Sequence, residues 1–243
     1  MTATALESIR SQLVVSCQAY PGEPMRDPKI MTAVALAAAA GGAAGIRAQG
    51  VEDLRAIRFA LALPLIGLIK HGDAGVFITP TVADCIGVAH TGAEIVALDG
   101  TTRPRPDGST LAACIQAIHD HGALAMADCG SVADAKASIT AGADCLGTTL
   151  GGYTGDRPVT PGPDLAFLRE LVVLSHVPVL AEGRIATPEH AAAALNLGAY
   201  AVVVGTAITH PTSITRHFVK TIDAIRTNRT RSESTDTTSG THA

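Results

Sequence analysis

Short apolar runs alternate with alanine-rich amphipathic segments along most of the chain. Most of these runs are apolar throughout, as expected for parallel strands that are buried on both faces. They predict eight strands, at residues 13–17, 45–47, 64–70, 94–99, 124–128, 144–148, 178–182 and 201–204. The segments between and after them predict eight helices, at residues 29–41, 51–61, 81–91, 109–121, 131–141, 163–173, 188–197 and 211–227.

Several predicted helices begin with a residue that favours a helix N-terminus. Asp27, Ser131, Asp164 and Thr187 are candidate N-caps, and a proline stands next to three of them. Eight βα units in about 225 residues favour a single (β/α)8 TIM barrel, which we assign to a catalytic domain at residues 1–227. An open doubly wound sheet is the alternative, and it is disfavoured because no G-x-G-x-x-G motif follows the first strand.

The two ends of the chain lie outside this repeat. Residues 3–12 predict a short N-terminal helix before the first strand. The final segment, NRTRSESTDTTSGTHA, is polar and low in complexity, so we expect residues 228–243 to form a disordered C-terminal tail. The N-terminus lacks the pattern of a signal peptide, and no apolar stretch is long enough for a membrane span.

Composition and charge narrow the classes of function. Acidic residues number 22 and basic residues 18, which gives a net charge of −4 at pH 7. This mild acidity argues against nucleic acid or a membrane surface as a partner, and aromatic residues, at 3%, are too few for stacking single strands. Five widely spaced cysteines indicate reduced thiols in a cytoplasmic protein rather than disulfides or a zinc site.

Polar or glycine residues stand at the ends of the predicted strands or directly after them. A barrel places its chemistry at the carboxyl ends of its strands, so these residues are expected to meet at one mouth. They are Gln18, Arg47, Lys70, Asp99, Asp128, Thr148, Thr149, Glu182, Gly183, Arg184, Gly205 and Thr206. One polar strand end is ordinarily just solvated, but eight that converge predict a functional site.

Lys70 and Glu182 are the candidate catalytic residues. Lys70 ends the apolar run PLIGLIK, and Glu182 ends PVLAE. Burial lowers the pKa of a lysine, which suits a general base or a Schiff-base amine. The alternatives are a lysine that extends to the surface and a structural salt bridge from Glu182 to Arg47 or Arg184. If both face one cavity, Lys70 and Glu182 form a proton-transfer pair.

The glycines after the seventh and eighth strands predict a phosphate site. Barrels commonly bind phosphate there through backbone N–H groups, although glycine is also ordinary in turns. The scattered histidines form no metal-ligand motif, so we expect no metal. The loop TTRPRPD, at residues 101–107, is stiffened by two prolines and either closes over the mouth or is simply solvated.

Nine motifs occur in order along the chain: SCQAYPGEP, GIRAQGVEDLRAI, LPLIGLIK, VFITPT, IVALDGTTRPRP, LAMADC, GTTLGGYT, VPVLAEGRI and GAYAVVVGTAIT. With them, residues 12–220 closely resemble the N-acylglucosamine-6-phosphate 2-epimerases, also called N-acetylmannosamine-6-phosphate 2-epimerases. The resemblance implies a (β/α)8 barrel that inverts C2 of N-acetylmannosamine 6-phosphate without a cofactor. It also implies N-acetylglucosamine 6-phosphate as the product and sialic-acid and amino-sugar catabolism as the pathway.

The resemblance also implies roles for individual residues. Lys70 ends the GLIK motif at the family's catalytic lysine, and Glu182 lies in AEGRI at its second catalytic residue. The matches near the sugar are Gln18, Arg47 and Asp128, and those on the phosphate side are Gly183, Arg184, Gly205 and Thr206.

The eighth strand departs from the family pattern. The family commonly reads GSAITRP where this chain reads GTAITHP, so Thr206 keeps a hydroxyl but His210 replaces an arginine. A histidine is only partly charged near neutral pH. If His210 reaches the phosphate, affinity is expected to depend on pH. The changes to ADCGS and ALDGT affect loop detail more than chemistry.

The implied reaction requires an open-chain aldehyde, because only then is the proton at C2 acidic. Neutral Lys70 can take this proton, and Glu182 can assist ring opening, act on the opposite face or hold Lys70 in place. Two alternatives remain, a Schiff-base aldolase that uses Lys70 and a non-catalytic phosphosugar-binding barrel. The sequence allows a homodimer without deciding the oligomeric state.

Overall fold

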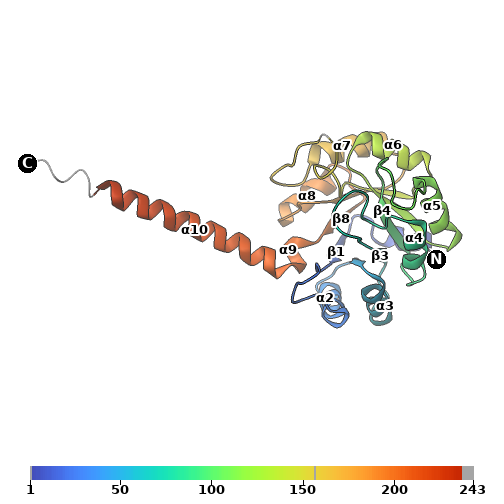
Figure 1. Ribbon diagram of the computed structural model, residues 1–243, viewed down its shortest axis with the longest axis horizontal. Helices are drawn as coiled ribbons and strands as arrows, with labels where there is room; N and C mark the ends of the chain where they lie inside the picture. The colour runs from blue at the N-terminus through green and yellow to red at the C-terminus, as the bar shows by residue number, and fades with distance from the viewer. Residues whose placement is uncertain (1, 156, 237–243) are drawn as a thin grey trace, which may run out of the picture. The chain divides into compact units, whose positions relative to one another are not determined.

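A computed structural model describes residues 2–155 and 157–236 of the chain, which divides into two compact units, Met1–Thr209 and His210–Ala243. The first unit is a closed barrel of eight parallel strands, each paired with the next and the last with the first (Figure 1). The strands are β1 (Leu13–Cys17), β2 (Gly45–Gln49), β3 (Leu65–Leu68), β4 (Ile95–Asp99), β5 (Leu124–Asp128), β6 (Cys145–Gly147), β7 (Val179–Glu182) and β8 (Ala201–Val204). The predicted TIM barrel is confirmed.

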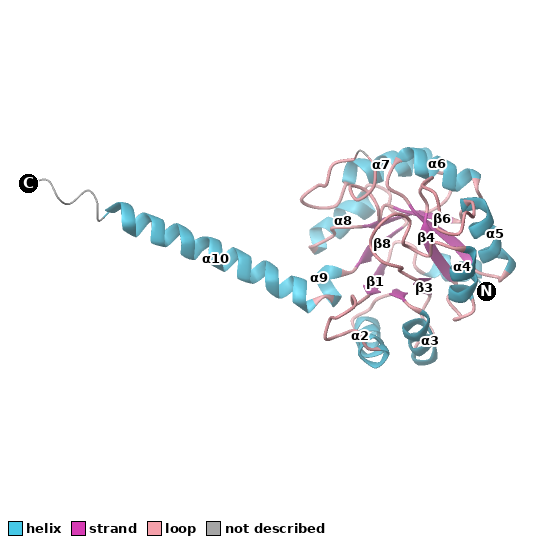
Figure 2. Cartoon of the chain, in the orientation of Figure 1, coloured by secondary structure: helices cyan, strands magenta, loops and turns pink. Residues whose placement is uncertain are grey.

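Helices surround the strands of this unit, which lie at its centre (Figure 2). The helices between strands are α2 (Pro28–Ala40), α3 (Val51–Ala60), α4 (Val82–Ala89), α5 (Leu111–Asp120), α6 (Val132–Thr140), α7 (Leu165–Leu174) and α8 (Pro188–Asn196). The short helices α1 (Thr2–Ser8) and α9 (Thr206–Thr209) precede β1 and follow β8. All four predicted N-caps are confirmed, since each side chain accepts a hydrogen bond from a backbone N–H of the first turn.

Side chains alternate between the two faces of each strand, as the two-residue period of a strand requires. Along β4, for example, Val96 and Leu98 pack outward in the core shared with the helices, whereas Ile95 and Ala97 fill the barrel interior. Ile9, which follows α1, is fully buried and packs with these interior residues. The phase of this alternation decides which residues at the strand ends point into the barrel.

The second unit contains one long helix, α10 (Pro211–Asp236). It continues past residue 227, where we expected a disordered tail to begin, and residues 237–243 of that predicted tail lie outside the described residues. No glycine or proline follows Pro211 within α10, so nothing there breaks the helix. The predicted domain boundary at residue 227 stays a prediction. Within the described part of the chain, no helix combines the length and apolar character needed to cross a membrane.

Candidate active site

The strand ends bring the predicted sugar-side and catalytic residues together. Asp128 and Glu182 end β5 and β7 in phase with interior residues, and Arg47 lies one step deeper on β2. Lys70 follows β3 in the same phase, two residues after the interior Leu68. The resulting cluster contains two basic and two acidic side chains within the mouth of one barrel.

Arg47 is the centre of this cluster and is only 1% exposed. Its guanidinium binds both oxygens of Asp128, at 2.6 Å and 3.3 Å, and approaches Glu182 Oε2 at 3.1 Å. Burial alone would lower the pKa of Arg47, but the two carboxylates offset this effect and raise it. The salt bridge between Glu182 and Arg47 that the sequence left open is therefore present.

Lys70 is held by a neutral partner rather than by a carboxylate. Its Nζ donates a hydrogen bond to Gln18 Oε1 at 2.7 Å and lies 5.4 Å from the centroid of the Tyr20 ring. Burial lowers the pKa of Lys70, and the charge of Arg47 lowers it further, whereas Glu182 opposes both effects. These surroundings favour the neutral amine that a general base must be.

The pKa of Glu182 is shifted in the opposite direction from that of Lys70. Burial raises the pKa of its carboxyl to about 7, although the charge of Arg47 counteracts this rise. A glutamic acid with this pKa is partly protonated at neutral pH and can give a proton as well as take one. Lys70 and Glu182 thus form a pair in which the amine is easily deprotonated and the carboxyl easily protonated.

Thr149 contacts the Glu182 carboxyl and Thr148 contacts the Glu182 backbone, roles that their position at a strand end does not reveal. The Thr149 hydroxyl donates to Asp128 Oδ1 at 2.6 Å and lies 3.3 Å from Glu182 Oε2. Because that hydroxyl has one proton, a protonated Glu182 can in turn donate to the Thr149 oxygen. Thr148 Oγ1 accepts from the Glu182 backbone N–H at 2.9 Å and donates to its carbonyl at 2.8 Å.

On the predicted phosphate side, two turns follow β7 and β8. Gly183 and Arg184 are both left-handed, with φ of +110° and +54°. Gly205 accepts hydrogen bonds from the backbone N–H groups of Ile208 and Thr209, and Thr206 begins α9. The Arg184 guanidinium is directed to the segment between β6 and α7, and no ion pair joins it to Glu182 among the described residues.

The comparisons with known proteins identify the family of this chain. The sequence model of the family described as "Putative N-acetylmannosamine-6-phosphate epimerase" matches residues 31–224. The chain belongs to this epimerase family. A relative described as "Putative N-acetylmannosamine-6-phosphate 2-epimerase", from Cutibacterium acnes, is 51% identical over 220 residues, covering 89% of this chain and 96% of the relative. Another, from Enterobacter sp., is 47% identical and covers 91% and 97%.

A solved structure of the same family supports this assignment. The N-acetylmannosamine-6-phosphate 2-epimerase from Clostridium perfringens superimposes with a TM-score of 0.86 at 43% identity, covering 88% of this chain and 95% of that one. A thiamine phosphate pyrophosphorylase from Pyrococcus furiosus, at 18% identity and a TM-score of 0.58, shares only the barrel fold.

Two further features of this epimerase-family chain were singled out in the sequence, the loop at residues 101–107 and His210. The loop at residues 101–107 is anchored to the end of β4, because Arg103 binds the Asp99 carboxylate at 2.7 Å and Arg105 donates to the Asp99 carbonyl. His210 begins the second unit, where its Nδ1 is 2.7 Å from Ser213 Oγ. Its predicted contact with phosphate stays a prediction.

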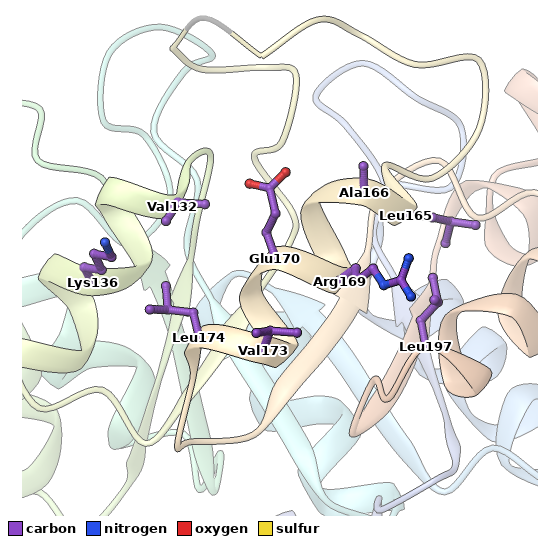
Figure 3. Close-up of a pocket in the computed structure, with 9 residues that line it drawn as sticks. All are labelled: Val132, Lys136, Leu165, Ala166, Arg169, Glu170, Val173, Leu174 and Leu197. Carbon is purple, nitrogen blue, oxygen red and sulfur yellow. The ribbon is translucent and has the colours of Figure 1, made fainter.

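A surface pocket of ≈ 820 Å³ lies among the outer helices (Figure 3). It is lined from the outer helices by Val132, Lys136, Leu165, Ala166, Arg169, Glu170, Val173, Leu174 and Leu197. None of the predicted site residues lines it. No group of three or more histidine, cysteine or acidic residues able to hold a metal occurs among the residues that the structure describes.

Proposed function

We propose that the chain is an isomerase that inverts C2 of N-acetylmannosamine 6-phosphate to give N-acetylglucosamine 6-phosphate. The observation that carries this proposal is the pairing, in one barrel mouth, of Lys70 with a lowered pKa and Glu182 with a raised one. Membership of the epimerase family supplies the substrate class. The relatives' names give the reaction, and Lys70 and Glu182 are the proposed proton-transfer groups that it needs.

Lys70 is the proposed base. In the open-chain sugar the C1 aldehyde makes the C2 proton acidic, and the neutral amine of Lys70 removes it. The electrons pass to the aldehyde oxygen, which gives an enolate. Protonated Lys70 and the guanidinium of Arg47 then supply the positive charge that stabilises this oxygen. Gln18, which accepts from the Lys70 amine, orients its lone pair and contacts the sugar with Asp128.

Glu182 is the proposed second proton carrier. Its pKa of about 7 allows it to exchange a proton at neutral pH, either during ring opening or on the face of C2 opposite to Lys70. A Glu182→Gln variant distinguishes the two roles. If Glu182 reprotonates C2, the variant still exchanges the C2 hydrogen of the starting sugar with solvent but forms no epimer. If it opens the ring, exchange and epimer formation are lost together.

The phosphate is assigned to the backbone of the turns after β7 and β8, at Gly183, Arg184, Gly205 and Thr206. Backbone N–H groups at this position are the usual phosphate site of a barrel. Binding energy from this remote group positions C2 against Lys70. The 6-phosphate is therefore required, and unphosphorylated N-acetylmannosamine is expected to react far less efficiently.

The decisive experiment is proton NMR of N-acetylmannosamine 6-phosphate with the protein in D2O. The epimerase is expected to form N-acetylglucosamine 6-phosphate with deuterium at C2. Ligand binding without deuterium at C2 would instead indicate a phosphosugar-binding protein. A lysine adduct trapped by borohydride would indicate a Schiff-base aldolase, because the epimerase mechanism forms no imine.

The setting of this reaction is also proposed. We place it in sialic-acid and amino-sugar catabolism in the cytoplasm, a reducing compartment that suits five free cysteines. We further propose a homodimer. In support, α10 exposes four large apolar side chains, Phe218, Val219, Ile222 and Ile225, which would be shielded from water at an interface.

A further inference from the structure

The side chain of Arg184 has no use in the proposed mechanism, yet its backbone is strained. With φ of +54°, Arg184 lies in the left-handed region, which only glycine adopts without steric penalty. An arginine at this position is advantageous only if its side chain contributes something that glycine cannot. Its contacts show what that contribution is.

The Arg184 guanidinium makes three hydrogen bonds to the segment between β6 and α7. Its Nε donates to the Gly162 carbonyl at 3.0 Å, and its two terminal nitrogens donate to the Gly151 carbonyl at 2.9 Å and to Thr160 Oγ1 at 3.1 Å. Its carbon also lies 5.1 Å from the centroid of the Tyr153 ring, within the range of a cation–π contact. Three of the five N–H groups are therefore engaged with this one segment.

These bonds connect the same two segments that hold Glu182. Glu182 lies two residues before Arg184, and its backbone N–H and carbonyl both bond to Thr148 Oγ1. Thr149, two residues before Gly151, places its hydroxyl 3.3 Å from the Glu182 carboxyl. A shift of the β6–α7 segment relative to the end of β7 would move this hydroxyl away from the carboxyl.

We infer that Arg184 is a positioning residue for Glu182: its guanidinium fastens the β6–α7 segment to the end of β7 and holds Thr149 against the Glu182 carboxyl. A phosphate at this turn meets backbone N–H groups and not the guanidinium. The consequence for catalysis rests on the proposed epimerase function, whereas the fastening itself does not.

The test compares Arg184→Ala and Arg184→Lys, the second of which keeps the charge but loses the planar fork. Thr160→Val is the matched variant that removes one acceptor without changing any charge. Amide hydrogen exchange at residues 150–154 is measured together with kcat, KM and inhibition by inorganic phosphate. In both Arg184 variants we expect amide exchange at these residues to become about ten-fold faster or more. We expect kcat to fall by about ten-fold or more, since small misplacements are costly in an active site.

KM and the inhibition constant for inorganic phosphate are expected to stay within about two-fold, because the phosphate contacts are retained. Thr160→Val is expected to act in the same direction with a smaller effect. Weaker phosphate inhibition in Arg184→Ala that Arg184→Lys restores would overturn the inference and make Arg184 a phosphate ligand. Unchanged exchange, or an unchanged kcat, would overturn it as well. If the wild-type protein does not epimerise, the proposed function fails, and hydrogen exchange still decides whether Arg184 fastens the segment.

Discussion

Arg47 influences the protonation of both proposed catalytic groups, although it transfers no proton itself. Its charge lowers the pKa of Lys70, in the same direction as burial, and opposes the rise that burial causes at Glu182. The bidentate bond to Asp128 keeps this cation in place inside the barrel. One buried arginine thus favours the neutral amine while limiting the pKa of the acid to near neutrality.

The pH dependence of kcat/KM follows from these two shifts. Lys70 must be neutral to act as a base, so the rate is expected to rise with pH through its lowered pKa. Glu182 must be protonated to act as an acid, and the protonated fraction of its carboxyl falls as pH rises through about 7. A bell-shaped profile measured from about pH 5 to 10 would agree with this. A profile that only rises over this range would exclude Glu182 as the acid.

Replacement of Lys70 tests the base directly. Lys70→Ala is expected to reduce turnover by about 10²-fold or more, because the variant lacks the group that takes the C2 proton. Lys136→Ala on α6 is the matched control, since Lys136 lines the outer pocket, and it is expected to keep full activity. Both variants should retain the circular dichroism spectrum of the wild type. Near-normal epimerisation by Lys70→Ala would exclude Lys70 as the base.

The sequence could predict which residues meet at the mouth, but not how each side chain is directed. Lys70, Asp128 and Glu182 share the phase of the barrel interior, and this phase is set by the two-residue period of a strand. Arg184 follows a left-handed glycine, so its direction depends on a turn that no local pattern specifies. The role of Thr149 was missed for a related reason, because its partners come from β5 and β7.

At the scale of elements, the apolar runs predict where the strands lie but not where each strand ends. The run at residues 64–70 predicts one strand, whereas β3 spans Leu65–Leu68. The strand ends early because the Ile69 N–H donates to Thr79 Oγ1, a side chain, rather than to a neighbouring strand. The predicted helix at residues 211–227 is shorter than α10, because the polar composition after residue 227 indicates only that this part is not buried. A polar segment can still form a helix.

Two glycines are expected to respond in opposite directions to the same substitution. Gly147 on β6 has no room for a Cβ, which would lie 2.6 Å from Met126 Cε and 2.9 Å from Asp128 Oδ1. Gly147→Ala is expected to lower the free energy of unfolding by about 1–3 kcal/mol and to reduce activity. Gly87 in α4 faces open space, so Gly87→Ala is expected to raise the free energy of unfolding by about 0.5–1 kcal/mol. Thermal denaturation of both variants measures the difference, and equal shifts would contradict it.

At the scale of the whole molecule, α10 combines an apolar face with a polar end. Phe218, Ile222 and Ile225 recur at spacings of four and three residues, which places them along one side of the helix. They are 64%, 57% and 52% exposed. Beyond residue 227 the sequence contains no apolar residue larger than alanine, so that part offers almost nothing to bury.

These two parts of the C-terminal region are expected to differ in their effect on assembly. Light scattering coupled to size-exclusion chromatography should give the mass of a dimer for the full chain. The double variant Phe218→Ser, Ile222→Ser should shift this mass toward the monomer, because it removes apolar surface from the proposed interface. Deletion of residues 228–243 is the matched control and should leave the mass, the melting temperature and the activity essentially unchanged. A dimer mass that persists in the double variant would place the interface elsewhere. A melting temperature several degrees lower after the deletion would show that residues 228–243 contribute to stability despite their composition.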